Sequence, residues 1–216
     1  MNLLSTISNY NRTRKYSLFI RELRPTVTSS ILDAGFANRE YHDTDNFLEK
    51  YYIPSYNITA LGLDIHGSDL FEPRYPAVKV RLYDGKIFPF RDKCFDVGWS
   101  NAVIEHVGDE DRQLLFLKEM NRTCKAFYFT TPNRYFPFEL HTRLPLLHYL
   151  PKKVFDIILK LTPLKWAAGD YMHLLSRRRI ESLMSKAGIK QYRIVRNRMF
   201  GFTMDFSIIV DKVKDK

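Results

Sequence analysis

Apolar runs that stop at small, acidic or amide residues recur along most of the chain. Such runs are typical of buried strands, and the segments between them carry apolar residues at helical spacing. Alternating strands and helices predict an α/β fold with a mostly parallel sheet covered on both faces. Ligands of such sheets lie beyond the carboxyl ends of the strands, so these ends predict a binding crevice. The expected strands are residues 31–32, 58–64, 78–83, 95–100, 126–131, 192–195 and 206–210.

Helices are expected between these strands from apolar spacing and from residues that start or stop a helix. Ser176 has the character of an N-cap, and Gly188 that of a helix stop. A leading helix over residues 16–23 is stopped by Pro25. The other expected helices cover residues 45–52, 110–120 and 152–161.

A longer motif lies before and within the expected fourth strand. Residues 84–96 read Asp-Gly-Lys-Ile-Phe-Pro-Phe-Arg-Asp-Lys-Cys-Phe-Asp. With the strand ends around it, this motif resembles the class I S-adenosylmethionine-dependent methyltransferases, most closely the small single-domain "type 11" kind, over residues 28–210. The resemblance implies a Rossmann-like, seven-stranded, mostly parallel sheet with an antiparallel C-terminal hairpin and helices on both faces. It also implies one domain over residues 1–216, with 1–27 as an N-terminal helical extension and 133–175 as an acceptor-site insert or lid.

The resemblance implies S-adenosylmethionine as cofactor and an enzyme that transfers its methyl group. A carboxylate suits the ribose because it can accept two hydrogen bonds from neighbouring hydroxyls. Four strand ends supply the expected contacts. These are Asp33 and Gly35 for the methionine portion, Asp64 for the ribose, Asp84 and Gly85 for the adenine, and Asn101 near the transferred methyl.

The loop after the first strand departs from the family pattern. Ala37 and Arg39 stand where the family has glycines, two and four places after Gly35. An arginine does not easily take the positive φ that glycine adopts. We expect either a loop of different shape or a reduced affinity for the cofactor.

Two histidines are candidates for the chemistry of transfer. A base is needed only when the acceptor is a weak nucleophile such as a hydroxyl. His106 follows the fourth strand, and a direct chemical role and a packing role are equally open for it. His141 follows the fifth strand and could be oriented by Glu139. His173 is expected to pack. The remaining histidines, His42, His66 and His148, are expected at the surface or in packing, and no spacing predicts a metal.

The charge balance favours anionic partners. The chain carries 34 basic and 24 acidic residues, a formal net charge of +10. We expect a small-molecule or carrier-linked acceptor, with a sugar, a lipid-linked glycan or a phosphate-bearing molecule as candidates. A non-catalytic binding domain on the same scaffold is the alternative. A nucleic-acid methyltransferase is disfavoured because no Asn/Asp-Pro-Pro-Tyr/Phe motif follows the fourth strand, and the sequence does not specify the oligomeric state.

The compartment is expected to be the cytoplasm. No secretory signal and no apolar run long enough to cross a bilayer is present. Cys94 and Cys124 are expected to pack as free thiols. Residues 152–161 are expected to form a lid helix, because their apolar residues spread around the helix. A helix lying on a membrane is the rival interpretation, so a peripheral membrane contact stays open.

Overall fold

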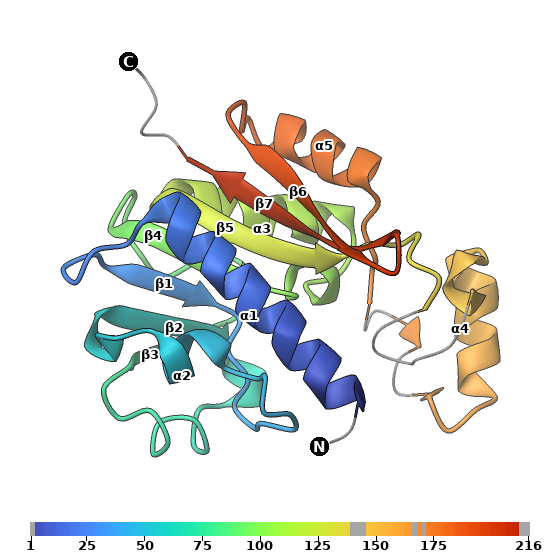
Figure 1. Ribbon diagram of the computed structural model, residues 1–216, viewed down its shortest axis with the longest axis horizontal. Coiled ribbons are helices and arrows are strands. Elements are labelled where there is room, and N and C mark those ends of the chain that lie inside the picture. Colours follow the sequence, from blue (N-terminus) through green and yellow to red (C-terminus); the bar gives the residue numbers. More distant parts are fainter. Residues whose placement is uncertain (1–2, 139–145, 166–167, 170–171, 212–216) are drawn as a thin grey trace. The chain divides into compact units, whose positions relative to one another are not determined.

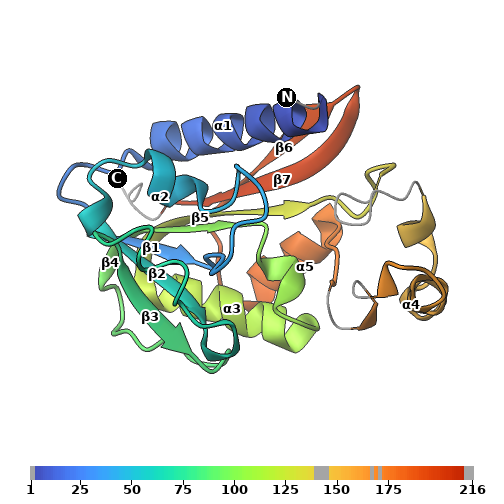
Figure 2. The same ribbon diagram turned by 90° about the horizontal axis from the view of Figure 1, so that it is seen from below.

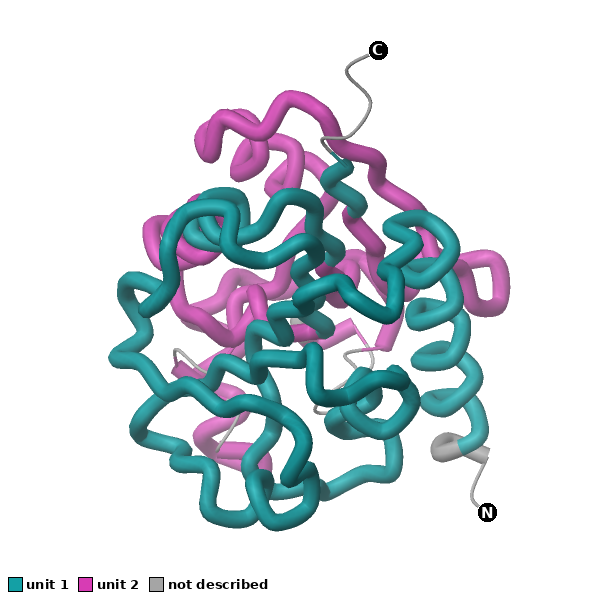
Figure 3. The backbone as a smooth tube through the Cα atoms, turned by 90° about the vertical axis from the view of Figure 1, so that its left-hand side faces the viewer, with its two compact units in different colours: residues 1–101, 119–128, 209–216 teal, residues 102–118, 129–208 magenta. Residues whose placement is uncertain are grey.

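The structure is a computed structural model that describes residues 3–138, 146–165, 168–169 and 172–211. The chain divides into two compact units, shown in different colours in Figure 3. Unit 1 comprises residues 1–101, 119–128 and 209–216, and unit 2 comprises residues 102–118 and 129–208. The prediction of a single domain with a lid insert stays a prediction.

Seven strands form one sheet in the order β3-β2-β1-β4-β5-β7-β6 (Figure 1). The predicted fold class is therefore confirmed, including the C-terminal hairpin, which turns at Phe200 and Gly201. The strands are β1 (Ile31–Ala34), β2 (Ile58–Leu63), β3 (Lys79–Tyr83), β4 (Phe95–Asn101), β5 (Cys124–Pro132), β6 (Arg193–Met199) and β7 (Phe202–Val210).

Strand β1 lies at the centre of unit 1 and pairs in parallel with both β2 and β4. All four residues of β1 are buried, as expected for a strand covered on both faces. Strand β2 also pairs in parallel with β3, where Leu63 lies opposite Tyr83. The chain therefore brings the ends of these four strands to one edge of the sheet.

Helices α1 (Leu3–Leu23) and α2 (Phe47–Tyr51) lie on the same face of β1 and β2 in unit 1 (Figure 2). The ring of Phe19 in α1 lies 4.9 Å from that of Trp99 and 5.8 Å from that of Tyr128. Tyr16 contacts Phe47 of α2 at 5.7 Å. These aromatic contacts anchor α1 to the sheet. The predicted end of this helix was right, but the predicted start at residue 16 was wrong because residues 3–15 carry no regular apolar stripe.

Unit 2 contains α4 (Lys152–Lys160) and α5 (Arg177–Lys186). The predicted cap of α5 is confirmed, since the Ser176 side chain accepts a hydrogen bond from the Arg179 backbone N–H at 3.3 Å. Gly188 follows the helix with a φ of 72°, which glycine adopts without strain. Helix α3 (Glu110–Thr123) and strands β5 and β7 have residues in both units.

Four short 3-10 helices complete the described chain. They are η1 (Ser55–Asn57), η2 (Asp64–His66), η3 (Ile104–His106) and η4 (Leu147–Tyr149). Among the residues that the structure describes, no helix has the length and apolarity needed to cross a bilayer.

Replacing Phe19 by Ala should lower the free energy of unfolding by about 3–5 kcal/mol, because it removes a fully buried ring and leaves a cavity. Urea denaturation followed by circular dichroism measures the change. Tyr10→Ala is the matched control on the same helix, because the Tyr10 side chain is 67% exposed. Equal losses in the two variants would show that α1 is not anchored through Phe19.

Candidate active site

The predicted cofactor residues of unit 1 follow four neighbouring parallel strands. The sheet order reverses direction between β1 and β4, and ligands of open α/β sheets lie at such a switch point. The Ser100 hydroxyl donates a buried hydrogen bond to the Ala34 carbonyl at 2.8 Å, which joins the ends of β1 and β4. The geometry thus gathers the predicted residues at one edge, although their role in binding stays a prediction.

Asp64 and Asp84 are adjacent at this edge and both are exposed. Each directly follows a strand end, and those ends, Leu63 and Tyr83, lie opposite each other. Asp84 accepts a hydrogen bond from the backbone N–H of Lys86 at 3.0 Å across a turn in which Gly85 has a φ of 81°. The two carboxylates are therefore available to a ligand that has several hydroxyl or amine groups.

Asp33 lies deeper than the other two acids. It pairs with Ala60 of β2, four residues before Asp64, and only 5% of it is exposed. Glu49 of α2 is equally buried, and neither of its carboxylate oxygens has a conventional hydrogen-bond donor. The two carboxyl groups lie close enough to influence each other's ionisation, and the pKa of each is raised. This buried acid pair, Asp33 with Glu49, is the most unusual electrostatic feature of unit 1.

Burial is the main cause that raises the pKa of Asp33, and the negative charge of Glu49 adds to it. The positive charge of Arg12 on α1 acts in the opposite direction without outweighing them. Burial also raises the pKa of Glu49, while the neighbouring Asp33 lowers it. The pKa of Asp33 is therefore raised further than that of Glu49.

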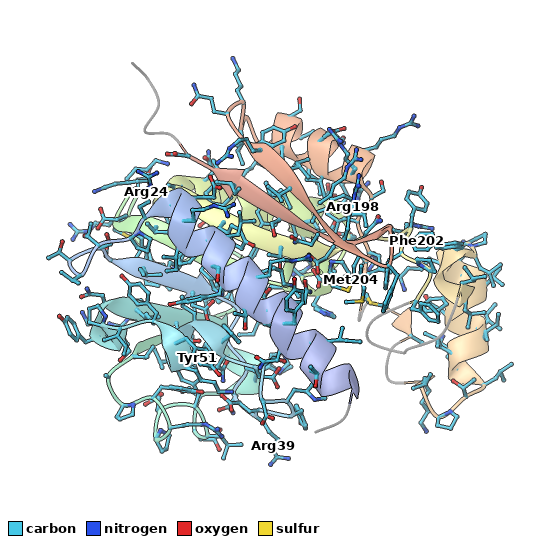
Figure 4. All side chains as sticks on the ribbon, viewed as in Figure 1. Arg24, Arg39, Tyr51, Arg198, Phe202 and Met204 are labelled. Carbon is cyan, nitrogen blue, oxygen red and sulfur yellow. The ribbon has the colours of Figure 1, made fainter. Side chains whose placement is uncertain are left out.

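The loop after β1 is ordered by side-chain amides where the family uses glycines. Gly35 keeps a φ of 111°, but neither Ala37 nor Arg39 has a positive φ. The Asn46 side chain accepts from the Ala37 N–H at 2.8 Å and donates to the Ala37 carbonyl at 2.9 Å. Arg39 is exposed and points away from the ribbon (Figure 4). Ala37 and Arg39 therefore occupy this loop without the left-handed backbone that glycine permits, and both expectations for the loop stay predictions.

Asn38 ties this loop to the loop that follows β2. Its amide nitrogen donates to the His66 carbonyl at 2.9 Å and to the Asp69 carboxylate at 2.8 Å. Its oxygen accepts from the backbone N–H groups of Leu70 and Phe71 at 3.0 and 3.1 Å. The loop carrying Gly35 and the loop carrying Asp64 therefore form one hydrogen-bonded layer.

Glu40 adds charged contacts to the same hydrogen-bonded layer. It forms ion pairs with Lys50 at 2.9 Å and Arg74 at 3.0 Å, and it accepts a hydrogen bond from the Tyr75 hydroxyl. Burial alone would raise the pKa of Glu40, but hydrogen bonds from Tyr75, Lys50 and Asn46 outweigh burial and lower it. Glu40 thus favours its ionised form and holds the loop, in contrast to the acid pair, whose pKa values are raised.

His106 belongs to unit 2, at the end of η3, and is partly exposed. Its neighbour Glu105 is fully buried and accepts a hydrogen bond from Thr131 at 3.0 Å. The His173 backbone N–H donates to the Glu105 carbonyl at 2.7 Å, and Gln113 donates to the His173 carbonyl at 3.0 Å. His173 therefore helps to hold η3 in place. His141 and Glu139 lie outside the described residues.

The sequence did not point to Glu49, Glu40, Asn38 or Asn46. A weak signal existed for Glu49, since an acid within Phe47-Leu48-Glu49 lies among residues predicted to be buried. The partners of Asn38, and Arg74 and Tyr75 among the partners of Glu40, are about 30 or more residues away along the chain, so no local pattern could have revealed these contacts.

Comparison with known proteins supports the assignment of the fold. The family model described as "Methyltransferase domain" matches residues 46–126. A SAM-dependent methyltransferase from Methanosarcina mazei has a TM-score of 0.55 at 16% identity, covering 85% of this chain and 92% of that one. A geranyl diphosphate C-methyltransferase from Streptomyces coelicolor A3(2), in complex with Mg2+, geranyl diphosphate and S-adenosyl-L-homocysteine, has a TM-score of 0.60 at 14% identity, with coverages of 93% and 79%. None of the curated proteins compared with the chain matches it.

The strand order, the family match over the central segment and these structural neighbours agree with one another. The chain has the fold that these methyltransferases share, and its central segment, residues 46–126, matches the methyltransferase family model, in agreement with the resemblance of the strand-end motifs.

Replacing Glu49 by Gln should make the protein more stable at neutral and alkaline pH by about 1–2 kcal/mol. A raised native pKa stabilises the fold at low pH, and this contribution is lost as the pH rises through the native pKa. Removing one acid of the pair therefore reduces the free energy of unfolding that is lost as the pH rises. Urea denaturation at about pH 4 and about pH 8 should show a difference between the variant and the wild type mainly at the higher pH. A Glu72→Gln control changes an exposed acid. A pH-independent effect of Glu49→Gln would contradict the raised pKa values of the acid pair.

Proposed function

We propose that this chain transfers a methyl group from S-adenosylmethionine to a small or carrier-linked acceptor that bears a phosphate, with a sugar or a lipid-linked glycan as the methylated part. The observation that carries the proposal is the edge of unit 1, where the buried Asp33–Glu49 pair lies below the exposed carboxylates of Asp64 and Asp84.

The acid pair fits the cationic end of this cofactor. Both oxygens of Glu49 are buried without a donor, so an ammonium group from the methionine portion would satisfy them. Asp64 would accept hydrogen bonds from the ribose hydroxyls, and Asp84 with Gly85 would lie against the adenine. Asn101, the last residue of β4, would lie near the transferred group.

When bound, S-adenosylmethionine supplies a methyl group on a positively charged sulfur, which is already a good leaving group. The chain's own residues mainly have to align the acceptor and exclude water. His106 is the described candidate for accepting a proton from an acceptor hydroxyl, and His141 is the candidate in the loop after β5.

The charge of the chain supports a phosphate-bearing acceptor. The net charge of +10 favours anionic ligands in general. The Streptomyces neighbour was solved with geranyl diphosphate, which shows that a methyltransferase of this fold can act beside a diphosphate group. These observations support a phosphate-bearing acceptor and leave the methylated atom to experiment.

The Asp64→Ala variant should bind S-adenosylhomocysteine more weakly by about 1–3 kcal/mol, because charged hydrogen bonds to the ribose are lost. Isothermal titration calorimetry measures the change directly. Asp43→Ala is the control, since Asp43 is an exposed acid of the same unit away from the strand ends. Unchanged affinity in Asp64→Ala would refute the assigned site, and absence of binding by the wild type at millimolar ligand would favour a non-catalytic domain.

A further inference from the structure

A cavity of about 290 Å³ lies in unit 2, just beyond the carboxyl end of β5. Its walls come from the segment after β5, the start of α5 and the β6–β7 hairpin, all of unit 2 (Figure 1). Three arginines line it, Arg177 and Arg178 from α5 and Arg196 from β6. Among its described lining residues none is acidic, so the cavity is strongly positive.

Two of these arginines lack a counter-charge. Arg177 forms an ion pair with Glu181 at 2.8 Å. Arg178 and Arg196 are exposed, and no carboxylate of the described chain pairs with either. Two unpaired guanidinium groups beside one cavity repel each other unless an anion lies between them. This repulsion destabilises the fold when no anion is bound. A ligand with several negative oxygens would relieve it.

The walls of the arginine cavity are fixed by a buried amide. The Asn133 side chain, 9% exposed, donates to the Thr203 carbonyl at 2.8 Å, and its backbone N–H donates to the Met204 carbonyl at 2.9 Å. The Arg134 N–H donates to the Leu175 carbonyl at 3.0 Å, one residue before the cap of α5. The end of β5 therefore holds β7 and the start of α5 in place, and the site is largely preformed.

We propose that the arginine cavity binds the phosphate or diphosphate group of the acceptor. The inference rests on the proposed function and adds the residues that recognise the carrier. Guanidinium groups match the paired oxygens of a phosphate through two parallel hydrogen bonds. The position beyond a strand end is where acceptors of open α/β sheets are expected.

The test is calorimetric titration of inorganic pyrophosphate into the full chain at low salt. The double variant Arg178→Gln with Arg196→Gln should weaken binding at least about tenfold, since charge-assisted hydrogen bonds are lost. The matched control is Lys118→Gln with Lys190→Gln, which removes the same charge from exposed positions of the same unit. Uridine diphosphate-glucose and geranyl diphosphate, titrated in parallel, distinguish a nucleotide carrier from a lipid carrier.

A loss of pyrophosphate affinity in the arginine variant alone supports anion binding in the arginine cavity, whichever carrier binds more tightly. Equal losses in both double variants would show a general effect of positive charge and overturn the inference, as would a wild type that binds none of the three probes. S-adenosylhomocysteine is titrated on each protein as well. If it binds while the arginine variant behaves like the control, the cavity inference fails and the proposed function stands.

A second feature of unit 2 is independent of the arginine cavity. Helix α4 packs Phe155 and Leu159 into a small core with Met172. Its other side exposes an apolar stripe of Val154, Ile157 and Leu161, which are 43%, 60% and 84% exposed, and Leu161 directly follows the helix. Their spacing of three and four residues places them on one side of the helix. The expectation that the apolar residues form no stripe was therefore wrong, because they form two separate faces.

We infer that the α4 stripe lies on an anionic bilayer surface. Lys153 and Lys160 are exposed and border the stripe in the helical projection. The acid of the helix, Asp156, forms an ion pair with Lys152 at 2.9 Å and is turned away from the stripe in the same projection. An apolar line bordered by lysines has the charge and shape of a helix that lies in a membrane interface.

Co-sedimentation with phosphatidylglycerol vesicles and with phosphatidylcholine vesicles tests the membrane inference. The wild type should bind the anionic vesicles, and Ile157→Gln with Leu161→Gln should lower the partition coefficient at least about tenfold. Val27→Gln with Ile53→Gln is the control, because these residues are equally exposed but belong to unit 1. The inference would be overturned if the wild type bound no vesicles or if both variants lost vesicle binding equally. It would also be overturned if the wild type self-associated and the stripe variant did not.

Discussion

Parallel pairing of β1 with β2 on one side and β4 on the other is the constraint from which the candidate site follows. It brings the residues after four strands to one edge, although they are up to about 70 positions apart in sequence. A parallel sheet places all its carboxyl ends together, so each strand can contribute one ligand contact without a special loop. The recessed position of Asp33 follows from the same register, since β1 ends opposite the middle of β2.

The loop after β1 shows that a binding loop can be shaped without several glycines. Hydrogen bonds from Asn46 and Asn38 hold the backbone at Ala37 and beyond, and Glu40 adds two ion pairs. In a glycine-rich loop the backbone approaches the ligand because no side chain is present. Here the side chains themselves fix the loop, so its shape exists before any ligand arrives.

Much of the fold could be predicted from the sequence because it depends on local patterns. All seven strands, the end of α1 and both ends of α5 follow from apolar spacing, Pro25, Ser176 and Gly188. The start of α1 could not be predicted, since tertiary contacts of Tyr16 and Phe19 hold a helix whose first half has no apolar stripe.

The candidate site was predictable only in part. The strand-end positions of Asp64 and Asp84 follow from the motif, and the structure brings them together. The raised pKa of Asp33 depends in part on Glu49, which reaches it only through the packing of α2 against the sheet. The arginine cavity joins residues from segments around 133, 177 and 196, which only the folded chain brings near one another.

Asn38 has a consequence for how the molecule fluctuates. Because its one amide group satisfies partners in the loop after β2 and in the segment that follows, neither loop can open without breaking bonds of the other. Amide hydrogens of residues 35–46 and 66–71 would then exchange with solvent through a shared opening event, with similar protection, instead of fraying one by one. Access to the deep acid pair would be governed by that single cooperative motion.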